Sequence, residues 1–323
     1  MNLHPSELRE RAARALFRAE HFRSLAKRAL KPQAKPFVRS EAWLRRAEHS
    51  TPRAYSGKAL RWTHEGTTLE VTLEREPMNE LGTVALRELE ELSTYLVDGA
   101  GGARAMILSS ALEKGFSAGA DLRELYREMV DRRERGVPLL SQVRELRAFI
   151  DRIHRVFDIL DTVPITTVAA VQGVCFGGGF ELALTADVIV ADKSARFCFP
   201  ELRLGLVPGF GGVPRLQRDL GNAVVRDLLL TGRSLRATRA HEVGLVSQVV
   251  GRGQALPVAR SVATQAARFD RRTAVAAKRF IKAVPQADLD REKQVFTRLF
   301  ASPVVEAALQ RFVESDEVLP YLP

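Results

Sequence analysis

The sequence predicts an α/β protein, because strand patterns and helix patterns alternate along most of the chain. Leu69, Val71 and Leu73 alternate with polar neighbours, as in a half-buried strand, and leucines then recur at helical spacing over 86–96. The chain has 323 residues, of which 46% are hydrophobic, so it can form a large core. One large domain with attached segments accounts for this length.

Composition excludes several classes of protein. No run of 18 apolar residues occurs, so we expect no membrane-spanning helix. Cys175 and Cys198 form no paired motif, which argues against a disulfide scaffold or a zinc ribbon, and we expect both to be small buried residues. No secretion-signal pattern opens the chain, so we expect a reducing, cytoplasmic setting. The six histidines lack metal-ligand spacing, and we expect no metal site.

The net charge of +10 is concentrated at the N-terminus. Residues 1–58 contain 14 Lys/Arg and five Asp/Glu, so the other 265 residues carry a net charge of about +1. We assign 1–57 to a basic helical extension, with an amphipathic helix over 6–30 and a shorter one over 41–48 that carries Trp43. Three interpretations stay open: an arm packing on the body or a partner subunit, contact with an anionic surface, and an organelle-targeting sequence. The acidic residues weigh against targeting.

The body follows over 58–250, and 251–323 is expected to form a helical C-terminal region for oligomerisation. The strand patterns lie at 69–73, 105–109, 165–171 and 187–191, and the helical patterns at 86–96, at 122–160 and over most of the chain after Gly212. Arg215 and Arg218 lie on the first of these late helices, where we expect them to make surface or subunit contacts.

The stretch from Gly173 to Leu184 carries the strongest chemical signal. A strand pattern ends in three glycines, 177–179, and a helical pattern begins at once. Consecutive glycines let a ligand approach backbone N–H groups, and the helix N-terminus adds partial positive charge. Because the sequence has neither a GxxxxGK[ST] phosphate loop nor a GxGxxG motif here, we interpret this turn as a site that stabilises an oxyanion.

Two glutamates lie in apolar surroundings near this turn. Glu181 falls in the first turn of the predicted helix, and Glu201 follows Phe199 and Pro200. Burial would raise the pKa of a carboxyl group there, which suits general acid–base catalysis near neutral pH. The simpler alternatives are a carboxylate that stabilises a helix N-terminus and an ordinary turn residue. Two such glutamates beside an oxyanion site nevertheless indicate a water molecule held between carboxylates.

A second turn, over 117–121, follows the strand pattern at 105–109. Its small residues could supply another backbone N–H and complete a two-donor oxyanion hole with the glycine triplet. From spacing alone this signal is weak, since such turns are common.

Six segments in order make the sequence resemble the crotonase superfamily, that is, the enoyl-CoA hydratase/isomerase family. They are FSAGADL (116–122), VQGVCFGGGFELAL (171–184), ADVIVAD (186–192), FPELRLGLVPGFGG (199–212), LTGR (230–233) and GLVSQVV (244–250). The ordered set is far more specific than any one segment, and the resemblance runs from about Leu69 to Phe312.

The resemblance implies a spiral of ββα units with a C-terminal helical region, assembled as a homotrimer or a dimer of trimers. It implies an acyl-CoA substrate whose thioester oxygen binds the N–H groups of Ala120 and Gly178. Coenzyme A is then part of the substrate, and no separate cofactor is expected. By resemblance, Glu181 activates water and Glu201 protonates Cα of a 2-enoyl thioester. The residues expected along the CoA ester are Ala118, Ala120, Asp121, Leu122, Arg123, Gly177, Gly178 and Gly209.

Retention of both glutamates favours an enoyl-CoA hydratase, or its reverse dehydration. The alternatives are a crotonase-type isomerase or decarboxylase, an RNA-binding homologue, and a catalytically idle structural subunit. The body is not basic and the extension has few aromatic residues, so we expect no nucleic-acid partner. Phe176, Phe180 and Phe210 are bulky near the site and the 122–160 segment is long, which together predict a reshaped acyl pocket.

Overall fold

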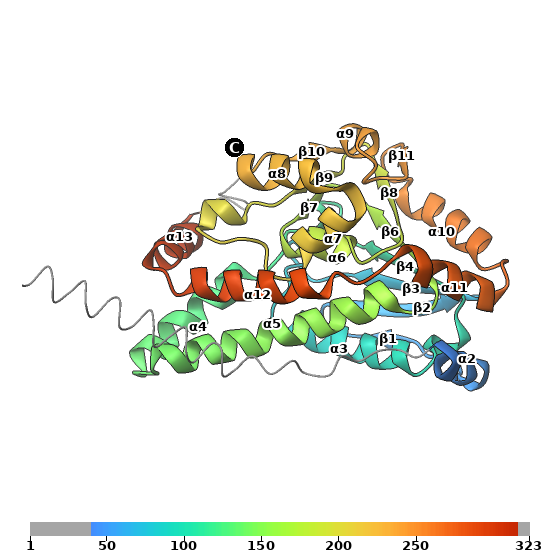
Figure 1. Ribbon diagram of the computed structural model, residues 1–323, viewed down its shortest axis with the longest axis horizontal. Helices are drawn as coiled ribbons and strands as arrows, with labels where there is room; N and C mark the ends of the chain where they lie inside the picture. The colour runs from blue at the N-terminus through green and yellow to red at the C-terminus, as the bar shows by residue number, and fades with distance from the viewer. Residues whose placement is uncertain (1–39, 316–323) are drawn as a thin grey trace, which may run out of the picture. The chain divides into compact units, whose positions relative to one another are not determined.

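The computed structural model describes residues 40–315 (Figure 1). The helix expected over 6–30 and the end of the C-terminal region, 316–323, lie outside the described residues. Within 40–315, no helix combines the length and apolar character needed to span a bilayer.

The larger sheet has seven strands, and it is antiparallel at one edge and parallel beyond it. Its order is β1 (Tyr55–Ser56), β2 (Leu60–Glu65), β3 (Thr68–Leu73), β4 (Ala105–Ser110), β6 (Thr166–Val171), β8 (Val188–Asp192) and β11 (Gln248–Val250). The pairs β1–β2 and β2–β3 are antiparallel, and every later neighbour is parallel. The four strands expected from sequence patterns are therefore confirmed as β3, β4, β6 and β8.

A second sheet of four short strands supports the candidate site. Its order is β10 (Leu235–Arg236), β9 (Arg196–Cys198), β7 (Val174–Phe176) and β5 (Gly115–Ser117). Three consecutive stretches of chain each give one strand to the large sheet, then one to the small sheet, and then a helix. These stretches begin at β4, β6 and β8, so the expected spiral of ββα units is confirmed.

The helices surround the two sheets (Figure 1). They are α2 (Ser40–His49), α3 (Thr83–Val97), α4 (Leu122–Glu134), α5 (Leu139–Thr162), α6 (Gly178–Ala183), α7 (Gly212–Leu220), α8 (Asn222–Thr231), α9 (Ala237–Glu242), α10 (Ala255–Ala266), α11 (Arg271–Ile281), α12 (Gln286–Phe300) and α13 (Pro303–Glu314), with 3₁₀ turns η1 (Ala100–Gly102) and η2 (Glu201–Leu204). The charged segment at 122–160 is helical as expected, and it divides into α4 and α5 around Gly136, whose φ is 66°.

The central strands of the large sheet, β3, β4, β6 and β8, are buried on both faces, whereas β2 alternates between buried and exposed residues. In β4, Ala105 and Ile107 pack against the alanines of α10, whereas Met106 and Leu108 join the main core. The main core also receives the leucine stripe of α3, all of which is buried. The sequence pattern of near-continuous apolar residues in β4 and β6 follows from this double burial.

Helix α2, which we assigned to the N-terminal extension, packs on the body. Trp43 is buried, and its Nε1 donates a hydrogen bond to Leu96 O at 2.7 Å. Leu44 and Ala47 are buried beside it. Helix α2 therefore contributes three side chains to the main core that α3 also joins.

Candidate active site

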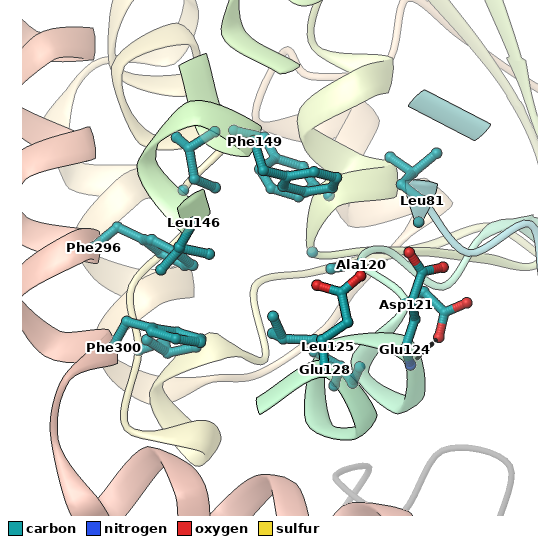
Figure 2. Close-up of a pocket in the computed structure, with 18 of the residues that line it drawn as sticks. Leu81, Ala120, Asp121, Glu124, Leu125, Glu128, Leu146, Phe149, Phe296 and Phe300 are labelled. Atoms are coloured by element: carbon teal, nitrogen blue, oxygen red, sulfur yellow. Dashed lines mark hydrogen bonds between the residues drawn. The ribbon is translucent and has the colours of Figure 1, made fainter. Parts of the chain in front are cut away.

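A cavity of about 380 Å³ lies among α4, α5, the start of α6, η2 and α12. Figure 2 shows Leu146, Phe149, Phe296 and Phe300 on one side of it and carboxylates of α4 on another. The structure gathers most of the residues expected from sequence in its wall: Ala118, Ala120, Asp121, Leu122, Gly177, Gly178, Glu181, Glu201 and Gly209. Arg123 does not line the cavity. It contacts α13 instead, where Nη1 donates to Val313 O at 3.1 Å.

Two glycine turns meet at the cavity wall. Gly119 has a φ of 101°, and a Cβ there would lie 2.8 Å from Phe176 O and 3.0 Å from Gly178 N. Gly177 has a φ of 48°, and a Cβ there would lie 2.7 Å from Glu201 Oε1. Both positions therefore need glycine for backbone conformation and for space.

The backbone N–H groups of Ala120 and Gly178 are adjacent donors at this junction. Ala120 N lies 3.4 Å from the position that a Cβ on Gly178 would take. Within residues 40–315, neither N–H has a hydrogen-bond acceptor. Because nearly all buried N–H groups in proteins are paired, two such donors at a cavity wall are a ready site for an anionic oxygen.

Glu181 lies in the first turn of α6, and only 2% of its surface is exposed. Its Oε1 accepts hydrogen bonds from the N–H groups of Phe210 and Gly212, each at 2.8 Å. Burial raises its pKa to about 7, although these N–H groups and the charge of Arg215 favour the ionised form. A carboxyl group with this pKa can exchange a proton near neutral pH.

Glu201 begins η2 and lies beside the glycine turn. Its Oε2 is buried and has no hydrogen-bond partner within the described part of the chain. Burial and the nearby charge of Glu181 raise its pKa well above the ordinary value for glutamate. Ionisation of Glu181 therefore favours the protonated form of Glu201, and the two carboxyl groups titrate as a pair.

A turn over 209–213 donates two backbone N–H groups to Glu181, and polar side chains from three helices hold this turn. Arg215 Nη1 donates to the carbonyl oxygens of Phe210 and Gly211, at 3.3 and 3.2 Å. His154 Nε2 lies 2.8 Å from Gly209 O, so this nitrogen carries the proton. Glu292 of α12 accepts from Gly211 N at 2.6 Å and from Val213 N at 3.0 Å. We refer to residues 209–213 as the 209–213 turn.

The expectation that Arg215 makes surface or subunit contacts is wrong. Its side chain is 0% exposed and is paired with Asp158 at 2.7 Å and Asp161 at 3.1 Å, both from α5. Sequence reasoning also missed Glu292 and His154. No local pattern marks these residues, because their partners lie between 54 and 81 positions away along the chain.

The long helical segment and Phe210 line the cavity, as the prediction of a reshaped acyl pocket requires, whereas two other phenylalanines do not. Phe176 and Phe180 are buried in the core and are absent from the cavity wall. The Phe180 ring packs 4.7 Å from Phe199 and 5.4 Å from Phe197, measured between ring centroids. Aromatic packing behind the site therefore explains the bulky residue before Glu181.

Asp121 lines the cavity and also stabilises the start of α4. Asp121 caps α4 by accepting from Glu124 N at 2.8 Å, and it pairs with Arg75 at 2.6 Å. Cys175 and Cys198 are buried, as expected, and burial raises the pKa of both thiols. Within residues 40–315, no group of three or more His, Cys, Asp or Glu side chains is arranged to hold a metal ion.

Comparison with known proteins agrees with this architecture. Residues 63–318 match the model of a family described as enoyl-CoA hydratase/isomerase. The chain belongs to this family. A probable enoyl-CoA hydratase of Mycobacterium bovis is 32% identical over 249 residues, which cover 76% of this chain and 90% of the relative. A short-chain-enoyl-CoA hydratase of Clostridium acetobutylicum is 30% identical over 259 residues, covering 79% and 94%.

Solved structures of the enoyl-CoA hydratase/isomerase family also resemble this chain. The enoyl-CoA hydratase from Bacillus anthracis is 30% identical with a TM-score of 0.61, and the match covers 79% of this chain and 96% of that one. The family membership and the fold thus agree, and the chain is an enzyme of the family.

Proposed function

We propose that this protein is an enoyl-CoA hydratase, which adds water reversibly across the α,β double bond of a 2-enoyl-CoA thioester. One observation carries the proposal: two buried carboxyl groups of raised pKa and two unpaired N–H donors share the wall of one cavity. Hydration needs both parts, because water must lose a proton and the thioester oxygen must accept negative charge.

The N–H groups of Ala120 and Gly178 would bind the thioester oxygen. As a nucleophile attacks Cβ, the π electrons shift toward this oxygen and form an enolate, which the two donors stabilise. Each well-placed donor contributes about 3–4 kcal/mol to such a transition state. Because α6 has only six residues, we assign this role to the two N–H groups rather than to a helix dipole.

The two glutamates would divide the proton transfers. Glu181, ionised and held by two N–H groups, takes a proton from water as the water oxygen bonds to Cβ. Glu201, whose protonated form the charge of Glu181 favours, gives its proton to Cα of the enolate. The product is a 3-hydroxyacyl-CoA, with the water oxygen on Cβ and the former Glu201 proton on Cα. Glu181 then holds the water proton, and transfer of that proton to Glu201 resets the pair.

The CoA portion would lie along the 118–122 turn, with Gly177 and Gly209 close to the thioester. Arg123 is exposed and remains our candidate for contact with a CoA phosphate. We also propose assembly as a homotrimer or a dimer of trimers. The exposed Phe280 (89%) and Ile281 (76%) at the end of α11 support a subunit contact. The buried free thiols suit the cytoplasmic setting that we propose.

The test follows the loss of the conjugated thioester absorbance of crotonyl-CoA and longer 2-enoyl-CoAs. We expect rapid loss with the wild type and a decrease in kcat of at least about 100-fold for both Glu181→Gln and Glu201→Gln. Glu113→Gln, at an exposed position, is the matched control and should behave as wild type. Binding of CoA esters without hydration of any of them would contradict the proposal.

A further inference from the structure

Glu292 binds the same turn as Glu181, through the alternate backbone amides. The N–H groups of Phe210 and Gly212 point to Glu181, and those of Gly211 and Val213 point to Glu292. Two carboxylates from helices far apart in sequence therefore hold four consecutive N–H groups.

Burying a carboxylate costs free energy, yet Glu292 is only 7% exposed. It is absent from the cavity wall, so it does not touch a ligand there. Both of its oxygens are used by the turn, and a carboxylate is the side chain that can accept from two N–H groups at once. A glutamine would offer one acceptor and would turn an N–H₂ group toward the second donor.

The other face of the turn is fixed as well. Arg215 holds the carbonyl oxygens of Phe210 and Gly211, and His154 holds that of Gly209. Without Glu292, the N–H groups of Gly211 and Val213 would lose their acceptor. The turn would then be held only by Arg215 and His154, through its carbonyl oxygens, and by Glu181. The orientation of the donors to Glu181 then depends on Glu292.

We propose that Glu292 is a positioning residue for Glu181: by fixing alternate amides of the 209–213 turn, it aims the intervening amides at the Glu181 carboxylate. The proposal rests on the role proposed above for Glu181 in hydration. A residue that merely anchors α12 would stabilise the fold without acting through Glu181, so the two roles predict different results.

The first test combines kinetics with a double-mutant cycle. For Glu292→Gln we expect kcat to fall about 10- to 100-fold, with KM changed less than about threefold. In a Glu181→Gln background the same substitution should change the residual kcat less than about twofold, because its effect passes through Glu181. Asp290→Asn is the matched control, since Asp290 lies on the same helix, pairs with Lys293 and should leave kcat unchanged.

Two outcomes would overturn the proposal. One is a Glu292→Gln enzyme with wild-type kcat. The other is an equal loss of kcat in the wild-type and Glu181→Gln backgrounds, which would indicate general damage. If Glu292→Gln does not fold, Glu292→Asp takes its place, because its shorter carboxylate cannot reach both amides, and the same split between kcat and KM is expected.

A second measurement does not depend on hydratase activity. Amide hydrogen exchange, resolved to single residues in the turn, compares wild type, Glu292→Gln and Asp290→Asn. We expect Glu292→Gln to accelerate exchange at Phe210 and Gly212, the amides bound by Glu181, and Asp290→Asn to leave them unchanged. Acceleration confined to Gly211 and Val213 would overturn the positioning role. A wild type that hydrates no enoyl-CoA would refute the proposed function and leave this result interpretable.

Discussion

Arg215 and Asp161 form an ion pair in which neither side chain is exposed to solvent, with Nε 3.1 Å from Oδ2. Asp161 also pairs with Arg218 at 2.9 Å and Lys282 at 3.1 Å. The same guanidinium donates to two carbonyl oxygens of the 209–213 turn. The pair thus links α5 and the C-terminal helices to the turn that holds Glu181.

Arg215→Met should destabilise the fold, because it leaves a buried carboxylate with fewer partners. Removing one member of a buried ion pair costs about 3–5 kcal/mol, which urea unfolding would measure. The charge of Arg215 also lowers the pKa of Glu181, so its loss should raise that pKa above about 7. Arg239→Met, in an exposed pair with Glu242, is the control and should change stability by less than about 1 kcal/mol. Equal stability of the two variants would contradict this account.

The rate of hydration should depend on pH as a bell-shaped curve. Glu181 must be ionised to accept a proton from water, so kcat/KM should fall as pH decreases below about 7, the value to which burial raises its pKa. Glu201 must be protonated to give up a proton, and burial and the charge of Glu181 raise its pKa, so activity should be lost again on the alkaline side. Because the two carboxyl groups interact, the two apparent pKa values of the curve belong to the pair and not to either glutamate alone. Initial rates between pH 5.5 and 9.5 test this, and a flat profile from 5.5 to 8 would exclude the assignment.

Local patterns in the sequence were sufficient to predict four strands of the large sheet and the glycine turns, but not the short strands of the second sheet. The alternation of Leu69, Val71 and Leu73 and the glycine triplet depend on neighbours within a few residues, and the structure places them as expected in β3 and at the start of α6. The position of Glu181 in the first helical turn follows from the same local information.

Contacts between distant segments could not be predicted in this way. Helical periodicity gives the face on which Arg215 lies, but whether acidic partners cover that face depends on α5, more than 50 positions earlier. The direction of Phe180 depends on the phenylalanines of the next ββα unit. Glu292 contacts the turn across 81 positions, and its charged surroundings in sequence resemble those of any exposed helix.

Gly119→Ala should impair catalysis by displacing one oxyanion donor. A Cβ at this position would lie 2.8 Å from Phe176 O, and a φ of 101° disfavours any side chain, so the turn must move Ala120 N. We expect kcat to fall about 100-fold or more, the usual effect of losing one donor. Gly136→Ala is the control, because Gly136 also has positive φ but has open space around it. That variant should lose about 1–2 kcal/mol of stability and keep its kcat. Similar kcat values for both variants would argue against a donor at Ala120.

Phe149 should limit the length of the acyl chain, because its ring lies in the cavity wall among Leu146, Phe296 and Phe300 (Figure 2). Phe149→Ala removes that ring and should increase kcat/KM for a ten-carbon enoyl-CoA relative to crotonyl-CoA by about tenfold. Phe180→Leu changes a phenylalanine that packs on Phe199 behind the site. It should cost about 1–3 kcal/mol of stability and leave the ratio of the two substrates unchanged. Comparing the two variants distinguishes the effect of a residue in the cavity wall from that of a residue in the core behind it. A ratio that shifts for Phe180→Leu and stays constant for Phe149→Ala would mean that the acyl chain does not occupy this cavity.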